Sequence, residues 1–289
     1  MDVFLTLVIG GIGDGALYFL IAAGLTLIFG LLQVINFAHG GLYLWGAYMA
    51  TFLYAVTHQF WLALIVGAGA GAVLGIAMER GLLGRLYHHG TNQILITMGV
   101  MLILSEFVKV PFGVNGLNAP TPSFLSHSWL VGHVVLVEYQ WFTIVVGAMV
   151  YLVLHWLLRR TRLGMVIRAG VENAGLVEAC GIPIRNVFTV VFALGAALAG
   201  FAGALAGPYF GSVTPGMGLD MQLTAFIIVV IGGMGSVQGA LVGSLLVGVV
   251  TSFMSFYFPS LSVLVTVLVM AVVLLVRPQG LFGEARAAA

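Results

Sequence analysis

Two uncharged polar interruptions hold the side chains of this sequence that could handle a small solute. The first contains Asn36 and His39, and the second contains Ser236 and Gln238 among several glycines. Amide, imidazole and hydroxyl groups can replace part of the water shell of a partly apolar molecule. Interruptions paired between the two halves of a chain are typical of a translocation pathway. The alternatives are that Asn36 and His39 only bond neighbouring helices and that glycine-rich packing explains the second interruption.

The sequence has no pattern that predicts catalysis, nucleotide binding or a metal site. Lys109 is the only lysine, and the residues before it are not the glycines that a phosphate-binding loop requires. The seven histidines show no ligand spacing, and the single cysteine, Cys180, cannot form an internal disulfide. No Ser-His-Asp arrangement or paired carboxylates stand in a recognisable frame. We therefore expect a chain that is not an enzyme, with no metal or cofactor of its own and no nucleic-acid partner.

The composition predicts that these residues lie in a bilayer. Because 61% of the residues are hydrophobic, only 7% are charged and the uncharged runs are long, the chain would expose too much apolar surface in water. We expect an all-α, polytopic integral membrane protein with about nine transmembrane helices, eight to ten being compatible, some of them broken, in a single domain over 1–289. The spans are expected near 3–32, 42–56, 61–78, 93–112, 139–158, 188–209, 221–231, a segment ending near 258, and 261–276.

The basic residues predict the orientation. The stretch 159–187 holds five of the ten Lys and Arg residues, whereas 113–138 holds none. Short loops rich in Lys and Arg stay in the cytoplasm, so 159–187 should be a cytoplasmic loop and 113–138 an outer one. With the amino terminus in the periplasm and the carboxy terminus in the cytoplasm, nine of the ten basic residues lie inside. Pro208 and Pro215, with Asp220, should then mark a short outer turn.

Within the cytoplasmic loop, Gly170 to Gly181 is compatible with a helix of about three turns. Gly181 would end this helix and Pro183 would follow it. Such a helix could dock on a cytoplasmic partner, or the segment could be a solvated connection that contacts nothing.

Two series of glycines recur every fourth residue and should let helices approach closely. They are Gly67, Gly71 and Gly75, and Gly235, Gly239 and Gly243.

Three separate segments resemble a known family. The cytoplasmic segment from Glu178 to Pro183 resembles the coupling loop of bacterial ABC-importer permeases of the branched-chain amino-acid group. The segments 24–41 and 231–240 resemble that group's amino-terminal and carboxy-terminal signatures, and the ending 276–283 also fits, so the likeness extends over nearly the whole chain.

The resemblance implies an assembly with a second homologous permease, two ABC ATPase subunits and a periplasmic substrate-binding protein, in the inner membrane. ATP and magnesium would bind in the ATPases, and this chain would need no cofactor. The coupling loop would contact the ATPase through Glu172, Ala174, Glu178, Ala179, Gly181 and Ile182. The typical cargo is a branched-chain amino acid, and other small amino acids, amides or carboxylates are carried by related systems.

Two other functions remain open on sequence alone. An ion-coupled secondary transporter or channel would need carboxylates within the membrane, and Asp14 and Glu106 are the candidates. A structural membrane subunit that transports nothing is the third possibility.

Overall fold

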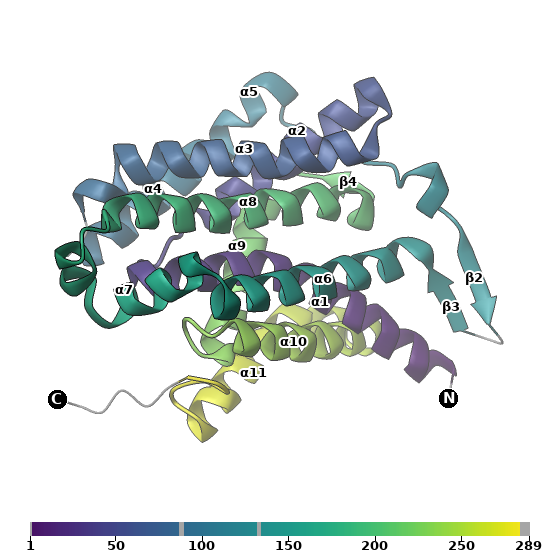
Figure 1. The fold of residues 1–289 in the computed structure, drawn as a ribbon. Helices are drawn as coiled ribbons and strands as arrows, with labels where there is room; N and C mark the ends of the chain where they lie inside the picture. Colours follow the sequence, from purple (N-terminus) through teal and green to yellow (C-terminus); the bar gives the residue numbers. More distant parts are fainter. Residues whose placement is uncertain (1, 87–89, 132–133, 284–289) are drawn as a thin grey trace.

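The computed structural model describes residues 2–86, 90–131 and 134–283, most of which form helices (Figure 1). The main helices are α1 (Asp2–Leu32), α2 (His39–Thr57), α3 (Phe60–Gly81), α4 (Gly90–Phe107), α6 (Glu138–Arg160), α7 (Arg162–Ala179), α8 (Ile184–Phe210), α9 (Met217–Gly232), α10 (Val237–Tyr257) and α11 (Ser262–Val276). The short helix α5 (Lys109–Phe112) follows α4, and three 3-10 turns are η1 (Leu83–Arg85), η2 (Ser123–Leu125) and η3 (Pro259–Leu261).

The structure supports a helical protein that crosses a membrane several times. Within the described residues, six helices are long and apolar enough to span a bilayer, and two more apolar helices, α9 and α11, are shorter. Each expected span contains one of the main helices, but α2 is not among the six because its sequence is less apolar. Helix α1 continues without a break for 31 residues, past the glycines near residue 10.

Among the described residues, four short strands lie at one end of the bundle. Strand β1 (Leu117–Asn118) pairs antiparallel with β4 (Ser212–Val213), and β2 (Ser128–Val131) pairs with β3 (Val134–Val137). We call this end of the bundle the hairpin end and the opposite end, where α7 lies, the α7 end (Figure 1).

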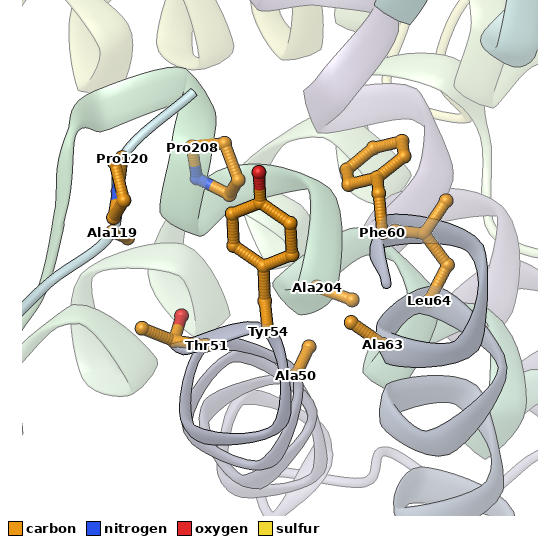
Figure 2. Close-up of a pocket in the computed structure, with 10 residues that line it drawn as sticks. All are labelled: Ala50, Thr51, Tyr54, Phe60, Ala63, Leu64, Ala119, Pro120, Ala204 and Pro208. Atoms are coloured by element: carbon orange, nitrogen blue, oxygen red, sulfur yellow. The ribbon is translucent and has the colours of Figure 1, made fainter. Parts of the chain in front are cut away.

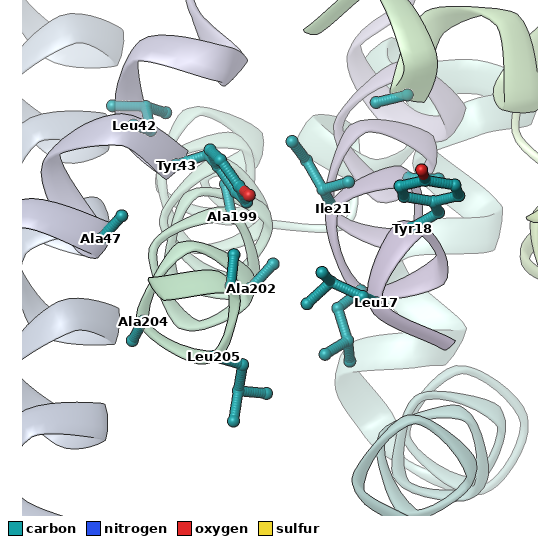
Figure 3. Packing of buried hydrophobic residues seen from close by; sticks show 14 of the residues in the cluster. Leu17, Tyr18, Ile21, Leu42, Tyr43, Ala47, Ala199, Ala202, Ala204 and Leu205 are labelled. Carbon is teal, nitrogen blue, oxygen red and sulfur yellow. The ribbon is translucent and has the colours of Figure 1, made fainter. Parts of the chain in front are cut away.

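Helices α1, α2 and α8 form the centre of the core. Helix α8 contacts α1, α2 and α3, and α1 packs along α10 and α6. The side chains between α1, α2 and α8 alternate between bulky and small, as Tyr43 beside Ala199 and Ala202 illustrates (Figure 3). Small side chains on α8 allow its neighbours to approach closely, which is how helices gain packing energy where lipid removes the hydrophobic driving force.

Candidate functional site

The first interruption forms a broken helix in the middle of the bundle. After α1 ends at Leu32, residues 33–38 are non-helical and run back along α1, so that His39 at the start of α2 lies beside Ile21. Ile21 is eleven residues before the end of α1, a distance of about 16 Å along the helix axis. Half of a 30 Å bilayer core is about that thickness, so α2 begins near the midplane.

A second helix begins at the same depth. Gly218, in the first turn of α9, packs directly against Gly40 in the first turn of α2. A Cβ atom on Gly40 would collide with the backbone oxygen of Gly218, and a Cβ on Gly218 would lie 2.8 Å from the backbone oxygen of Gly40. Helix α9 then crosses behind α8 toward α10 and α11 (Figure 1). We call the meeting point of these two helix starts the junction.

Hydrogen bonds tie the junction to three helices. The backbone N–H of Gly40 donates to Oε1 of Gln222 on α9 at 2.7 Å. His39 donates through Nε2 to the backbone oxygen of Ile21 on α1 at 3.1 Å, which leaves its other ring nitrogen as an acceptor. Asn36 accepts from the N–H of Ala38 at 3.0 Å and so fixes the turn that leads into α2. These bonds satisfy backbone groups that a helix start in a membrane would otherwise leave unpaired.

Three buried polar atoms of the junction have no partner among the described residues. They are Nδ2 of Asn36, Nδ1 of His39 and Nε2 of Gln222, on side chains that are at most 1% exposed. Each such atom costs about 1–3 kcal/mol when it stays unpaired in a dry interior. The junction therefore holds two donors and one acceptor that a polar guest or a rearrangement of the helices could satisfy.

The second interruption lies elsewhere. Ser236 accepts from the N–H of Gly239 at 3.1 Å and caps α10 at the α7 end, where Gly235 lies against Gly30 near the end of α1. Gln238 is half-buried in the first turn of α10. The structure thus brings Asn36 and His39 together but places Ser236 and Gln238 in a tight turn at one end of the bundle.

The predicted coupling segment is divided into two helical pieces. Helix α7 begins at Arg162, earlier than expected, and the backbone of Asn173 is non-helical (φ −156°, ψ 97°). The single helix of three turns predicted from Gly170 is therefore wrong, because the Asn173 side chain accepts from the N–H of Leu176 at 3.0 Å and starts a new short helix there. Gly181, with φ of +81°, ends this short helix as expected.

Most of the residues expected to contact an ATPase are on the surface of this segment. Glu172, Glu178, Ala179 and Gly181 are exposed, and Ala174 and Ile182 are partly buried. Leu176, beside them on the short helix, is 64% exposed. An exposed leucine flanked by carboxylates is a surface that a partner protein could cover.

The first piece of α7 attaches this surface to the core. Ile167 is buried among Leu27, Leu31 and Val191, and Gly170 lies against Leu31 and the first residue of α8. A displacement of the short helix would therefore reach α1 and α8 through close packing.

The two glycine series lie against other helices. A Cβ on Gly67 would lie 2.7 Å from Ala204, one on Gly71 would collide with the backbone oxygen of Ala196, and one on Gly75 would collide with the Ala196 side chain, all on α8. Gly239 meets Gly232 of α9 backbone to backbone, and Gly243 lies near the backbone oxygen of Ile228.

Comparison with known proteins assigns the family. The model of the family described as "Branched-chain amino acid transport system / permease component" matches residues 7–276. The chain belongs to this family of permease components. It is 29% identical to the high-affinity branched-chain amino acid transport system permease protein LivH of Escherichia coli, over 97% of this chain and 96% of that protein. It is 30% identical to the corresponding protein BraD of Pseudomonas aeruginosa, with the same coverage.

A more distant likeness covers part of the permease. The ribose import permease protein RbsC of Escherichia coli is 29% identical over 64% of this chain and 57% of its own length. No solved structure matches. The family match and the apolar helices together make this permease a multi-pass membrane transport subunit.

The cavity that Figure 2 shows is far too small for an amino acid. It lies between α2, α3 and α8 at the hairpin end, with a volume of about 10 Å³ (Figure 2). Tyr54, Phe60 and Pro208 are among its lining residues, and Thr51 brings a hydroxyl without a partner in the described chain. This volume suffices for about one water molecule.

The two carboxylates considered for ion coupling both have partners. Asp14 accepts a hydrogen bond from the hydroxyl of Tyr209 on α8 at 2.7 Å. Glu106 lies 2.5 Å from Nζ of Lys109 on an exposed face. Both are therefore engaged within the permease.

Sequence reasoning missed two residues of α9. Gln222 has no motif around it, and only the fold brings it to Gly40, 182 residues away. Asp220 was expected in an outer turn, but it lies in the first turn of α9 near the junction, because residues 211–216 descend from the hairpin end before α9 begins. The sequence signal for Asp220 was that an isolated carboxylate stands just before the apolar run of α9.

Proposed function

We propose that this permease is the membrane subunit of an ATP-driven ABC importer for branched-chain or other small amino acids in the bacterial inner membrane. It would act as a single membrane domain with about nine spans, among which α2 and α9 begin inside the bundle, with its amino terminus in the periplasm and its carboxy terminus in the cytoplasm. Likeness to LivH and BraD along nearly the whole chain is the observation that carries this proposal.

The proposed assembly places the cargo path between two permeases rather than within one. The cavity of about 10 Å³ between α2, α3 and α8 cannot hold an amino acid, so it is not the cargo path. Two ATPase subunits would bind ATP and magnesium and dock on the exposed surface around Leu176 and Glu178. A periplasmic binding protein would deliver cargo at the hairpin end.

Docking at the α7 end gives a direct mechanical connection. When the ATPases close on ATP, the short helix from Ala174 would move with them, and the packing of Ile167 and Gly170 would pass this movement to α1 and α8. The junction lies between these helices, so their movement would reorient α2 and α9. This series of movements is a rigid-body change of the helix bundle around the break that precedes α2.

An ion-coupled carrier has less support, since Asp14 and Glu106 are both bonded within the chain.

Purification through a tag on this chain, followed by mass spectrometry, tests the assembly. We expect two ATPase subunits and a second permease to copurify, and ATP-dependent uptake of labelled leucine when the complex is reconstituted with its binding protein. Uptake that persists without ATP and follows an ion gradient would contradict the proposal.

A further inference from the structure

The first turn of α9 carries a carboxylate on the outside of the bundle close to its middle. Asp220 is exposed, and it lies two residues from Gly218, which packs on Gly40 at the junction. Within the described part of the chain, Asp220 forms no salt bridge. A lone carboxylate facing lipid at this depth is strongly unfavourable, so Asp220 must face water or another polar group.

The segment leading to α9 supports the same conclusion independently. Residues 211–216 connect α8 to α9, and Gly211, Ser212, Thr214 and Gly216 are exposed. Val213, between them, is buried against Gly207. Irregular backbone within the hydrocarbon layer is tolerated only where it is covered by protein or lines water. The part of this segment between β4 and α9, with Thr214 and Gly216 exposed, is therefore unsuited to face lipid.

Other outward helix faces are suited to lipid. The middle of α6 exposes a continuous apolar stripe, and α4 exposes another along most of its length. These residues are Val145, Met149, Leu152, Val153 and Trp156 on α6, and Leu95, Met98, Leu102 and Ile103 on α4. The carboxylate of Glu106 at the end of α4 is neutralised by Lys109.

We propose that the outward side of α9, which comprises Leu219, Asp220 and Leu223 with residues 211–216, lines the translocation path, and that Asp220 binds the ammonium group of the amino-acid cargo there. Leu219 and Leu223 are each 51% exposed and share the side of the helix that bears Asp220. A carboxylate between two leucines matches a cation attached to a branched apolar side chain. The assignment of cargo rests on the proposed function, whereas the assignment of the path does not.

Cysteine labelling tests the path. In cells that express the complete complex, Asp220→Cys and Met149→Cys are treated with a cationic, water-soluble methanethiosulfonate, and the labelled fraction of each peptide is quantified by mass spectrometry against a cysteine-free peptide of the same chain. Met149 is the matched control because it is 59% exposed at the centre of α6. Thiols react with this reagent as thiolates, which form in water, so we expect Asp220→Cys to react at least tenfold faster. Thr214→Cys, which keeps the carboxylate in place, should also react faster than the control.

Uptake of labelled leucine by the reconstituted complex tests the ammonium site. We expect Asp220→Asn to lower uptake at least tenfold and Asp220→Glu to keep a third or more of it. Glu106→Gln, which removes another outward carboxylate, should stay within twofold of the wild type.

The outcomes separate the two proposals. If Asp220→Cys and Thr214→Cys both react as slowly as Met149→Cys, the side of α9 does not line the path. If labelling is fast but Asp220→Asn transports normally, the ammonium site is refuted. If the wild-type complex moves no amino acid, the proposed function fails, while the labelling result still decides the path.

Discussion

Replacing Gly71 by alanine should destabilise the permease, whereas the same change at Gly69 should not. The two glycines lie two residues apart in α3 and differ in what a Cβ atom would meet. At Gly71 it would collide with the backbone oxygen of Ala196 and lie 3.0 Å from the Cα of Gly200, and at Gly69 it would meet nothing within 4 Å. Backbone atoms cannot rotate away as a side chain can, so α3 and α8 would have to separate at Gly71.

The difference in stability between Gly69→Ala and Gly71→Ala follows from two contributions to the free energy of unfolding. Alanine stabilises a helix interior by about 1 kcal/mol relative to glycine, and both variants gain this amount. Only Gly71→Ala suffers overpacking, which costs about 1–3 kcal/mol and more when the obstacle is backbone. The variants should therefore differ by roughly 1–3 kcal/mol, which corresponds to roughly 2–10 °C in the apparent midpoint of thermal unfolding.

The assay is heating of the purified permease in detergent, followed by chromatography of the fraction that remains monodisperse. Gly71→Leu should show a larger loss and a lower yield of complex. Equal midpoints for Gly69→Ala and Gly71→Ala would refute the conclusion that α3 and α8 need glycine at this contact.

Three further sets of substitutions probe the junction and the coupling segment. Gln222→Leu removes the acceptor for the N–H of Gly40 and should cost about 1–3 kcal/mol, measured as a lower unfolding midpoint than that of Leu223→Ala, which alters an exposed neighbour. Asn36→Leu and His39→Leu should each lower leucine uptake by the reconstituted complex, and unchanged rates would remove both residues from the pathway. Glu178→Arg and Gly181→Trp should abolish uptake while membrane insertion stays normal, because a charge reversal in a docked helix typically costs a few kcal/mol; normal uptake by both would contradict docking at this surface.

The sequence was informative where local chemistry decides structure. The apolar runs predicted the helices, and the glycine at 181 predicted the end of the coupling segment, because a positive φ favours glycine. The break at Asn36 and His39 was also visible, since polar residues and two glycines interrupt an apolar run.

The sequence did not predict how deep in the bundle each interruption lies. The two uncharged interruptions have similar composition, yet one lies at the middle of the bundle and the other at its end, because residues 33–38 double back along α1 whereas 233–236 form a simple turn. The surroundings of Gln222 and Asp220 are formed by residues far away in the chain, near Gly40. The kink at Asn173 was missed because its side chain competes with the backbone for one N–H, and composition does not decide that competition.

The late position of α9 in the chain has a consequence for biogenesis. Helix α2 is not one of the six helices of the described residues that are long and apolar enough to span a bilayer, and its first turn is held in part by Gln222 and Gly218. At about 5–20 residues per second, the ribosome completes α9 some 9–35 s after α2. During this interval His39 can already bond to Ile21 on α1, but the N–H of Gly40 lacks its acceptor on Gln222 and would wait at the translocon or against a membrane chaperone. Depletion of such insertion factors should therefore impair this permease more than proteins whose spans insert one by one.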